Sequence, residues 1–322
     1  MNLTELNQLD YCLNISCTER PGSPAVYILL YVFAAIVVLL TLGGNLLVII
    51  SVFHFKKLHT PTNMLVLSLA ISDFLIGALV MPPLLIWTID SCWILGQRFC
   101  ISFSITSTFL TSISIYNVVL IAVDRYFALS NPFLYMNKVS VMRINVVIVI
   151  NWCVWVVYVF ALLYFNGNVG SWKNCLNMCL LFINEVWSVI DLVLMFIFPF
   201  SVIIILYSGV FVIAKKHATA IRELSKQTRS QTHNESMKSE RKAAKVLGIL
   251  VSVFMACLLP YYIQSLVVNA QYVQKSIIIF CLNSTINPVI YALFYPWFRR
   301  CIKIVITLQI FQTDSGLINV IS

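Results

Sequence analysis

The chain has 322 residues, of which 60% are hydrophobic and 10% are charged, whereas about 25% of residues are charged in soluble domains. With a mean hydropathy of +0.92, its few polar side chains cannot cover the surface of a water-soluble globule. The net charge is +9, but the positive residues are spread over particular loops and form no nucleic-acid-binding face. The composition predicts a membrane protein.

Seven apolar runs are long enough to cross a hydrocarbon layer of about 30 Å as helices. Their expected limits are 26–53, 62–89, 99–128, 144–165, 184–214, 243–269 and 276–295. Runs of this length lack the ten-residue alternation of β-barrel strands, and backbone groups in lipid must be paired internally. The sequence therefore predicts an all-α bundle of seven transmembrane helices.

The flanking segments predict the orientation and the domain limits. Of the 21 Lys and Arg residues, 17 lie in the loops after spans 1, 3 and 5 and in the tail after span 7. By the positive-inside rule, the N-terminal tail 1–25 is extracellular and the C-terminus is cytosolic, as expected for a multi-pass plasma-membrane protein. The transmembrane domain covers 26–296, with a polar cytosolic loop at about 215–242. Segment 297–322 is expected to form a short amphipathic helix and a tail, with Cys301 a candidate for palmitoylation.

The outer segments carry modification signals. Asn2 and Asn14 each begin a glycosylation sequon in the extracellular tail. Six of the ten cysteines fall on or beside outer segments, where an oxidising environment favours disulfides. These are Cys12, Cys17, Cys92, Cys100, Cys175 and Cys179. The residues alone leave their pairing open.

Three acids lie inside the spans, namely Asp73, Asp124 and Asp191. An ionisable group in lipid is costly and needs a partner, so each marks a candidate functional site. Asp124 is followed by Arg125 and Tyr126 at the cytosolic end of span 3, and Glu240 stands shortly before span 6. Such an ion pair can hold two helices together or release them. For the triplet taken alone, an ordinary surface ion pair is the alternative.

One motif in each span resembles the rhodopsin-like G-protein-coupled receptors. The motifs are Gly43-Gly44-Asn45, Leu69-Ala70-Ile71-Ser72-Asp73, Cys100 with Asp124-Arg125-Tyr126, Trp152, Pro199, Pro260 and Asn287-Pro288-Val289-Ile290-Tyr291. The run 283–299 resembles the fingerprint of the trace amine-associated receptors, and Ser91-Cys92-Trp93 is similar to that group. The resemblance covers about 26–303. It implies a receptor, not an enzyme, that binds a small amine agonist and signals to a heterotrimeric G protein.

The resemblance also implies pairings that spacing does not give. Cys100 is expected to bond Cys179, and Cys175 to bond the N-terminal tail, with Cys17 favoured over Cys12. A sodium-linked polar cluster is implied at Asp73, Ser114, Asn283, Ser284 and Asn287. Hard oxygen ligands suit sodium, and a buried carboxylate needs a cation or a proton. A water-filled network without sodium is the alternative, and no other cofactor is expected.

The ligand site departs from the usual aminergic pattern. Most aminergic receptors carry an Asp seven residues after the disulfide cysteine of helix 3, where this chain has Ser107. Asp191, eight residues before Pro199, offers a carboxylate at similar depth on helix 5, as in a subgroup abundant in fish. Because a lone buried carboxylate is poorly solvated, we expect it to bind a cationic amine. A hydrogen bond from Ser112 or from a tyrosine is the alternative.

Several further ligand contacts are expected. Trp187 lies one turn from Asp191 and can add a cation-π contact. The other expected contacts are Ser107, Thr108, Thr111, Tyr261, Tyr262 and Cys281. With Ser107 uncharged, we expect a monoamine, since Glu185 near the rim is the one candidate for a second acid.

The family's activation residues match this chain with one exception. The matching residues are Asp124, Arg125, Tyr126, Tyr207, Asn287, Pro288 and Tyr291. Leu258 replaces the switch tryptophan two residues before Pro260. We expect amine binding to weaken a contact from Arg125 to Glu240 and open a groove for a stimulatory or olfactory G protein. Arrestin, a receptor kinase and membrane lipid are further expected partners.

Other functional classes fit the sequence less well. A retinal protein needs a lysine in span 7, where Cys281 stands. A transporter would show repeated broken spans, and an enzyme would show a catalytic constellation or a metal-ligand cluster. We expect an olfactory receptor, and the alternative is a non-olfactory biogenic-amine or other small-molecule receptor of the same fold.

Overall fold

A computed structural model describes residues 23–165, 179, 185–227, 248, 252–263, 270–294, 296–311, 316, 318 and 320. Every regular element in these ranges is helical. The longer elements are α2 (Pro24–His54), α3 (Pro61–Leu75), α4 (Met81–Asp90), α5 (Gln97–Ser130), α6 (Pro132–Lys138), α7 (Val141–Phe165), α8 (Glu185–Leu192), α9 (Phe198–Gln227), α11 (Ala270–Phe294) and α12 (Pro296–Ile306). Proline opens α2, α3, α6 and α12, where its missing N–H leaves no bond unmade.

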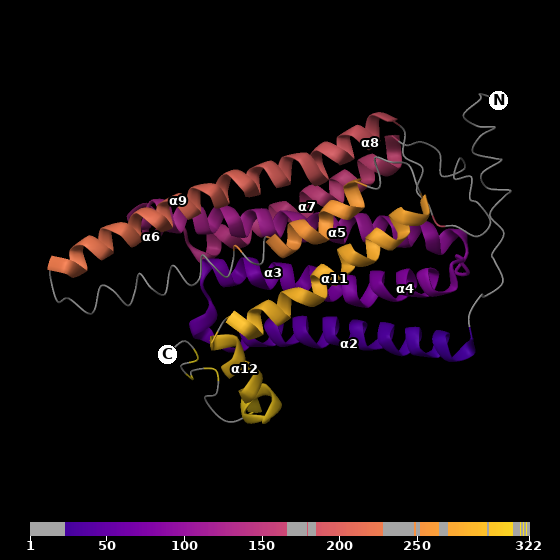
Figure 1. Ribbon diagram of the computed structural model, residues 1–322, viewed down its shortest axis with the longest axis horizontal. Coiled ribbons are helices and arrows are strands. Elements are labelled where there is room, and N and C mark those ends of the chain that lie inside the picture. The colour runs from indigo at the N-terminus through magenta and orange to yellow at the C-terminus, as the bar shows by residue number, and fades with distance from the viewer. Residues whose placement is uncertain are drawn as a thin grey trace.

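Five helices of the described residues are long and apolar enough to cross a membrane. They are Pro24–His54, Pro61–Asp90, Gln97–Ser130, Val141–Phe165 and Val186–Ile213. The shorter apolar helix Ser252–Ile263 lies in the sixth expected span, and α11 covers the seventh. The long helices run alongside one another, and α12 turns away at one end (Figure 1). The expected helical bundle is confirmed.

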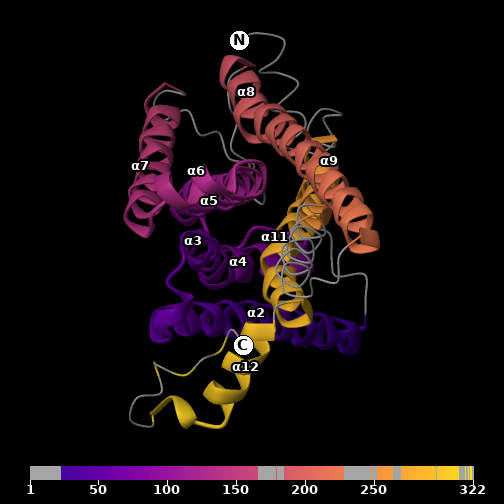
Figure 2. The same cartoon turned by 90° about the vertical axis from the view of Figure 1, so that its left-hand side faces the viewer.

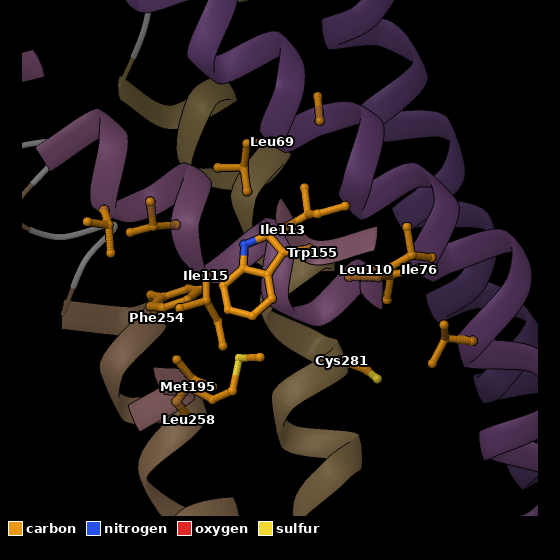
Figure 3. Packing of buried hydrophobic residues seen from close by; sticks show 14 of the residues in the cluster. Leu69, Ile76, Leu110, Ile113, Ile115, Trp155, Met195, Phe254, Leu258 and Cys281 are labelled. Atoms are coloured by element: carbon orange, nitrogen blue, oxygen red, sulfur yellow. The ribbon is translucent and has the colours of Figure 1, made fainter. Parts of the chain in front are cut away.

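Helix α5 lies at the centre of the bundle. It packs against α3, α7 and α9, and α2 lies against α3 and α11 (Figure 2). The main hydrophobic cluster joins side chains from all of these helices, and Trp155 is buried among them. Figure 3 shows Trp155 in the same cluster as Met195, Leu258 and Cys281. Leu258 is fully buried, so a leucine fills the place of the family's switch tryptophan.

Two wide turns of π-helix interrupt the spans next to prolines. The turn η2 (Ile76–Val80) precedes Pro82 and Pro83, and η3 (Val193–Ile197) precedes Pro199. A π turn would pair the carbonyl of Leu194 with the N–H of residue 199, but proline has none. The Leu194 carbonyl instead accepts a hydrogen bond from the Tyr116 hydroxyl of α5, at 2.9 Å. The proline thus leaves a carbonyl that links η3, in the fifth span, to α5, in the third span.

The Gly43-Gly44-Asn45 motif brings α2 close to α11. A Cβ atom on Gly44 would lie 2.7 Å from the Cβ of Pro288, so only glycine fits there. The Asn45 amide donates to the carbonyl oxygens of Thr41, at 2.9 Å, and of Ser284, at 3.0 Å. Helices α2 and α11 are therefore held together at the level where α11 carries its polar residues.

Helix α12 is amphipathic, with Arg299, Arg300 and Lys303 exposed. Phe298 and Cys301 point inward, and Cys301 is 0% exposed. It packs with Phe55, Leu58, Ile304 and Val320 in a small cluster apart from the main core. Burial raises the pKa of the Cys301 thiol to about 11. Protein side chains cover the thiol in this structure, and its palmitoylation stays a prediction.

Candidate ligand-binding and signalling sites

Asp191 lies at the end of α8 and reaches across to α7. Its Oδ1 atom accepts a hydrogen bond from the Tyr158 hydroxyl at 2.8 Å. Within the described part of the chain, its Oδ2 atom accepts no hydrogen bond and no Lys or Arg lies against the carboxylate. Asp191 is half-buried and Tyr158 is buried. The tyrosine contact weighed from the sequence is present, but it uses one oxygen of the two.

The serine alternative is not what the structure shows. Ser112 is fully buried, and its hydroxyl donates to the Thr108 carbonyl at 2.6 Å and contacts the Met195 sulfur at 3.3 Å. Neither contact is with Asp191. Among the described residues, the partner of the carboxylate therefore comes from α7, and α5 contributes none.

Aromatic rings surround the Asp191–Tyr158 pair. The Tyr158 ring meets Trp155 edge-to-face with 5.2 Å between centroids and meets Trp187 in the same way at 6.1 Å. Trp187 also stacks on Phe165 at 5.8 Å. Trp187 and Asp191 thus share Tyr158 as a neighbour, in agreement with the prediction that they lie on one helical face.

The helix Ser252–Ile263, in the sixth span, contributes two tyrosines to the same region. Tyr262 is 4% exposed and stacks on Phe196 of η3 at 4.7 Å, and Tyr261 meets Tyr262 edge-to-face at 5.0 Å. Both tyrosines lie close enough to Asp191 to interact electrostatically with its carboxylate. The structure thus places Trp187, Tyr261 and Tyr262 in the neighbourhood of Asp191, and their role in ligand binding stays a prediction.

The other expected ligand contacts are less clearly placed. Ser107, Thr108 and Thr111 are half-buried on α5, and no described hydrogen bond joins their side chains to Asp191. Cys281 is buried in the main hydrophobic cluster, on α11 (Figure 3). The side chain of Glu185 lies outside the described residues. The roles of these residues stay predictions.

One of the two outer disulfides that the resemblance implies is confirmed. Cys100, in the first turn of α5, is bonded to Cys179, with 5.5 Å between their Cα atoms. Cys92, one of the six outer cysteines for which the sequence favoured disulfides, is also disulfide-bonded. The remaining predicted positions, Cys17, Cys175, Asn2 and Asn14, lie outside the described residues.

Asp73 stands at the centre of a polar cluster and is fully buried. Its Oδ1 accepts from Ser114 at 3.1 Å and from Ser284 at 2.8 Å, and its Oδ2 accepts from Asn287 at 2.7 Å. Asn283 is buried as well, and its Oδ1 has no hydrogen-bond partner in the described structure. The structure therefore gathers four of the five expected residues, with Asn283 on the same helix face as neighbouring Ser284 and Asn287.

Asp124 is held by three donors at the cytosolic end of α5. Its Oδ2 accepts from Thr62 at 2.8 Å and pairs with Arg125 at 2.5 Å, and its Oδ1 accepts from Tyr135 at 2.7 Å. Arg125 also contacts the Thr62 hydroxyl. Burial and the nearby Asp124 carboxylate raise the pKa of Tyr135 to about 12. Tyr135 therefore remains a protonated donor at neutral pH.

The other activation residues lie around this cluster. Tyr126 packs on α9, where a Cβ on Gly209 would lie 2.7 Å from its ring. Tyr207 is half-buried and Tyr291 is buried. A cavity of about 150 Å³ opens beside Arg125 and Tyr291 and is also lined by Thr60, Thr62, Asn63, Val66 and Trp297. Glu240 lies outside the described residues, so its contact with Arg125 stays a prediction.

Two residues that contact the candidate sites escaped the sequence reasoning. Tyr158 follows Trp152 and Trp155 at intervals of three, so the aromatic face of helix 4 was a readable signal. Tyr135 lies in the short helix α6 beyond span 3, eleven residues after Asp124, and no periodicity marks it as a partner.

Comparison with known proteins identifies the fold family. A family model described as "7 transmembrane receptor (rhodopsin family)" matches residues 44–291. The chain is 38% identical to Trace amine-associated receptor 13c of Danio rerio over 95% of this chain and 94% of that protein. It is 39% identical to Trace amine-associated receptor 8b of Mus musculus, over 96% and 95%, and 37% identical to Trace amine-associated receptor 6 of Homo sapiens, over 98% and 96%. The chain therefore belongs to the rhodopsin family of seven-transmembrane receptors and, within it, to the trace amine-associated receptors.

Proposed function

We propose that the chain is a receptor for a small amine and that the ammonium group of the agonist binds Asp191. The observation that carries this proposal is the half-paired carboxylate, which has one protein donor and no described basic neighbour. A carboxylate in such a site gains from a cation that completes its hydrogen bonding. The names of the relatives point to the same class of ligand.

The aromatic rings support this orientation of the ligand. Because α5 carries Ser107 where most aminergic receptors have an Asp, the ammonium points toward Asp191 on α8 rather than toward α5. Trp187 lies against Tyr158 and Tyr262 lies near Asp191, so each offers a ring that can stabilise a cation there by about 0.5–2 kcal/mol. A monoamine satisfies a site that has one carboxylate among its described residues.

Replacement of the carboxylate tests the proposal. Asp191→Asn keeps the size of the side chain and removes its charge, and cAMP is measured in transfected cells against a panel of small amines. The loss of a buried charge pair, about 3 kcal/mol, corresponds to a potency loss of roughly a hundredfold.

Asp90→Asn is the matched control. Asp90 is another acid at the outer end of a helix, where Tyr31 donates to it at 2.9 Å. Its potencies are expected to stay within about threefold of wild type. Equal potency of wild type and Asp191→Asn, at equal surface expression, would remove the proposed anchor.

We infer that the inner cluster passes the signal to a heterotrimeric G protein of the stimulatory or olfactory type. Asp124 holds Arg125 through a direct ion pair in this structure. Amine binding at the fifth and sixth spans shifts the inner end of the sixth span, and Arg125 then contacts the G protein. Arrestin and a receptor kinase are further proposed partners.

Sodium is the proposed occupant of the Asp73 cluster. The cluster offers carboxylate, hydroxyl and amide oxygens, which are hard ligands of the kind that sodium takes. The buried oxygens of Asn45 and Asn283 lack hydrogen-bond partners in the described structure, which fits an ion or water between them and Asp73. Bound sodium would supply positive charge to a carboxylate that the bundle otherwise encloses.

The proposed location is the plasma membrane, with the N-terminal tail outside. Labelling of an N-terminal epitope on unpermeabilised cells tests this orientation, and loss of the glycosylated band in Asn2→Gln with Asn14→Gln tests the sequons. An olfactory role rests on the resemblance, and the presence of the transcript in olfactory sensory neurons tests it.

A further inference from the structure

The direction of Asp191 depends on the wide turn that follows it. Asp191 lies near the end of α8, and the π turn η3 separates α8 from α9. Ile203, which is 0% exposed, marks the side of α9 that faces the bundle. In an uninterrupted α-helix, with about 100° per residue, Asp191 would point about 120° away from Ile203. The extra residue of the π turn reduces this angle to about 20°, so the carboxylate faces the bundle and meets Tyr158.

Pro199 deprives one backbone carbonyl of its helical partner in either form of this turn. In the π form, the N–H of Phe198 donates to the Val193 carbonyl, and the next carbonyl, that of Leu194, would need the N–H that proline lacks. In the α form, the Met195 carbonyl would lose its partner instead, and the proline ring would crowd it. An unpaired carbonyl is costly inside a membrane. The form whose carbonyl finds another donor is therefore favoured.

Tyr116 supplies that donor to the π form. Its hydroxyl, on α5, donates to the Leu194 carbonyl at 2.9 Å. Its ring lies against Trp155, with 4.7 Å between centroids, and stacks on Phe198 at 6.3 Å. A ring packed against two others has little freedom to carry its hydroxyl to another acceptor. The third span thus pairs the carbonyl that the π form leaves over, three residues beyond Asp191.

We propose that Tyr116 is a positioning residue for the candidate ligand site, because its hydroxyl holds the π turn η3 and thereby directs Asp191 into the bundle. Tyr116 acts through the backbone of the fifth span, by way of the Leu194 carbonyl. Without this hydroxyl the π form loses its advantage, the turn closes as an α-helix, and Leu192 takes the inward place of Asp191. For amine binding the inference rests on the proposed role of Asp191, but the direction of residue 191 is measured without a ligand.

Cysteine labelling at two neighbouring positions tests the direction of α8. Asp191→Cys and Leu192→Cys are made separately in the full chain, and freeze-thawed membranes are treated with trimethylammonium-ethyl methanethiosulfonate. The thiolate attacks the reagent, a new disulfide forms, methanesulfinate leaves and the thiol proton passes to water. Labelling of the native cysteines, measured in the parent receptor, is subtracted. The thiol at position 191 is expected to react about tenfold faster than the thiol at position 192, because it faces the bundle, and an apolar, shielded thiol ionises poorly.

Tyr116→Phe tests the residue directly, because it keeps the ring and removes the hydroxyl. The order of the two labelling rates is expected to reverse, with position 192 now the faster. A general loosening of the structure would raise both rates together and would not exchange their order. Tyr158→Phe is the matched control, since its hydroxyl lies against residue 191 but does not pair the Leu194 carbonyl. The control should keep the original order, and an unchanged order in Tyr116→Phe would overturn the proposal.

Two further variants complete the test. Pro199→Ala returns the missing N–H and lets the α form close, so it should reverse the labelling order while Tyr116 stays in place. An unchanged order there would also overturn the proposal. With Asp191 intact, Tyr116→Phe is expected to lower amine potency about tenfold at equal surface expression. Tyr164→Phe, at a tyrosine that is 80% exposed, should leave potency unchanged.

The outcomes separate this inference from the proposed function. If Asp191→Asn abolishes amine responses while Tyr116→Phe leaves the labelling order unchanged, the anchor stands and the role of Tyr116 is wrong. If the order reverses while Asp191→Asn leaves amine responses unchanged, Tyr116 sets the direction of α8 and the anchor is wrong. If position 191 reacts no faster than position 192 in the receptor that keeps Tyr116, the direction assigned to Asp191 is wrong and the inference fails with it.

Discussion

Asp73 and Asp191 are both carboxylates inside the helix bundle, but the protein surrounds them differently. Asp73 is fully buried and accepts hydrogen bonds from three side chains, Ser114, Ser284 and Asn287. Asp191 is half-buried and, among the residues that the structure describes, accepts one, from Tyr158. A carboxylate that accepts from donors on two other helices ties those helices together, whereas one with an oxygen that no described donor fills has capacity for an organic cation. The number of described protein donors therefore separates Asp73, which joins helices and is the proposed sodium ligand, from Asp191, which is proposed to bind the amine.

The largest expected effect is a contrast between the same substitution at the two acids. Asp73→Asn removes a charged acceptor from three buried donors, and we expect the free energy of unfolding to fall by about 3 kcal/mol. Asp191→Asn keeps an acceptor for Tyr158, so its stability should change by less than about 1 kcal/mol. Thermal unfolding of the purified receptors in detergent, without ligand, measures both. Equal losses of stability would contradict the distinction between the two carboxylates.

A smaller effect is expected from Gly44, which seats the helix that brings Ser284 and Asn287 to Asp73. Gly44→Ala places a Cβ 2.7 Å from the Pro288 side chain, so α11 must shift, at a cost of about 2 kcal/mol. Amine potency should stay within about threefold, because the described donor to Asp191 comes from α7 and not from α11. Gly43→Ala is the control, since nothing lies within 4 Å of its added atom. A large loss of amine potency with unchanged thermal stability would reverse the expectation.

The smallest expected effect concerns the third embedded acid. Asp124 resembles Asp73 in having three donors, and Tyr135→Phe removes one of them. Loss of one charge-assisted hydrogen bond, about 1 kcal/mol, should raise ligand-independent cAMP roughly threefold to fivefold. A basal signal at or below that of wild type, at equal surface expression, would show that Tyr135 does not restrain the receptor.

The raised pKa of Tyr135 predicts how basal signalling depends on cytosolic pH. Its folded-state pKa, about 12, lies above the ordinary value near 10. The protonated hydroxyl that donates to Asp124 is therefore present throughout neutral pH, and its contribution is lost only as the pH rises through about 12. Basal signalling between cytosolic pH 6.5 and 8 should thus show no step attributable to Tyr135. Such a step, present in wild type and absent in Tyr135→Phe, would contradict this assignment.

The sequence predicted the features that depend on composition and on short motifs. Apolar runs located the spans, because lipid demands long helices, and the order of motifs led to the family and to the Cys100–Cys179 disulfide. The close packing of Gly44 on Pro288 explains why two of those motifs occur together. The family comparisons agree with the expectation of a receptor rather than an enzyme.

Features that depend on how two helices are rotated could not be predicted. Tyr158 meets Asp191 only because α7 and α8 turn those faces toward each other, and nothing in either segment specifies that rotation. Likewise, Cys301 is covered partly by Val320, which is distant along the chain and returns to α12. The amphipathic pattern of α12 gave its apolar face but not the residue that covers it.

The most direct test is a cryo-electron microscopy structure of the receptor with an amine agonist and its G protein. We expect the ligand nitrogen within about 3 Å of the Asp191 carboxylate, with the rings of Trp187 and Tyr262 beside the ligand. A ligand nitrogen bound elsewhere, with Asp191 bonded to Tyr158 alone, would contradict the account.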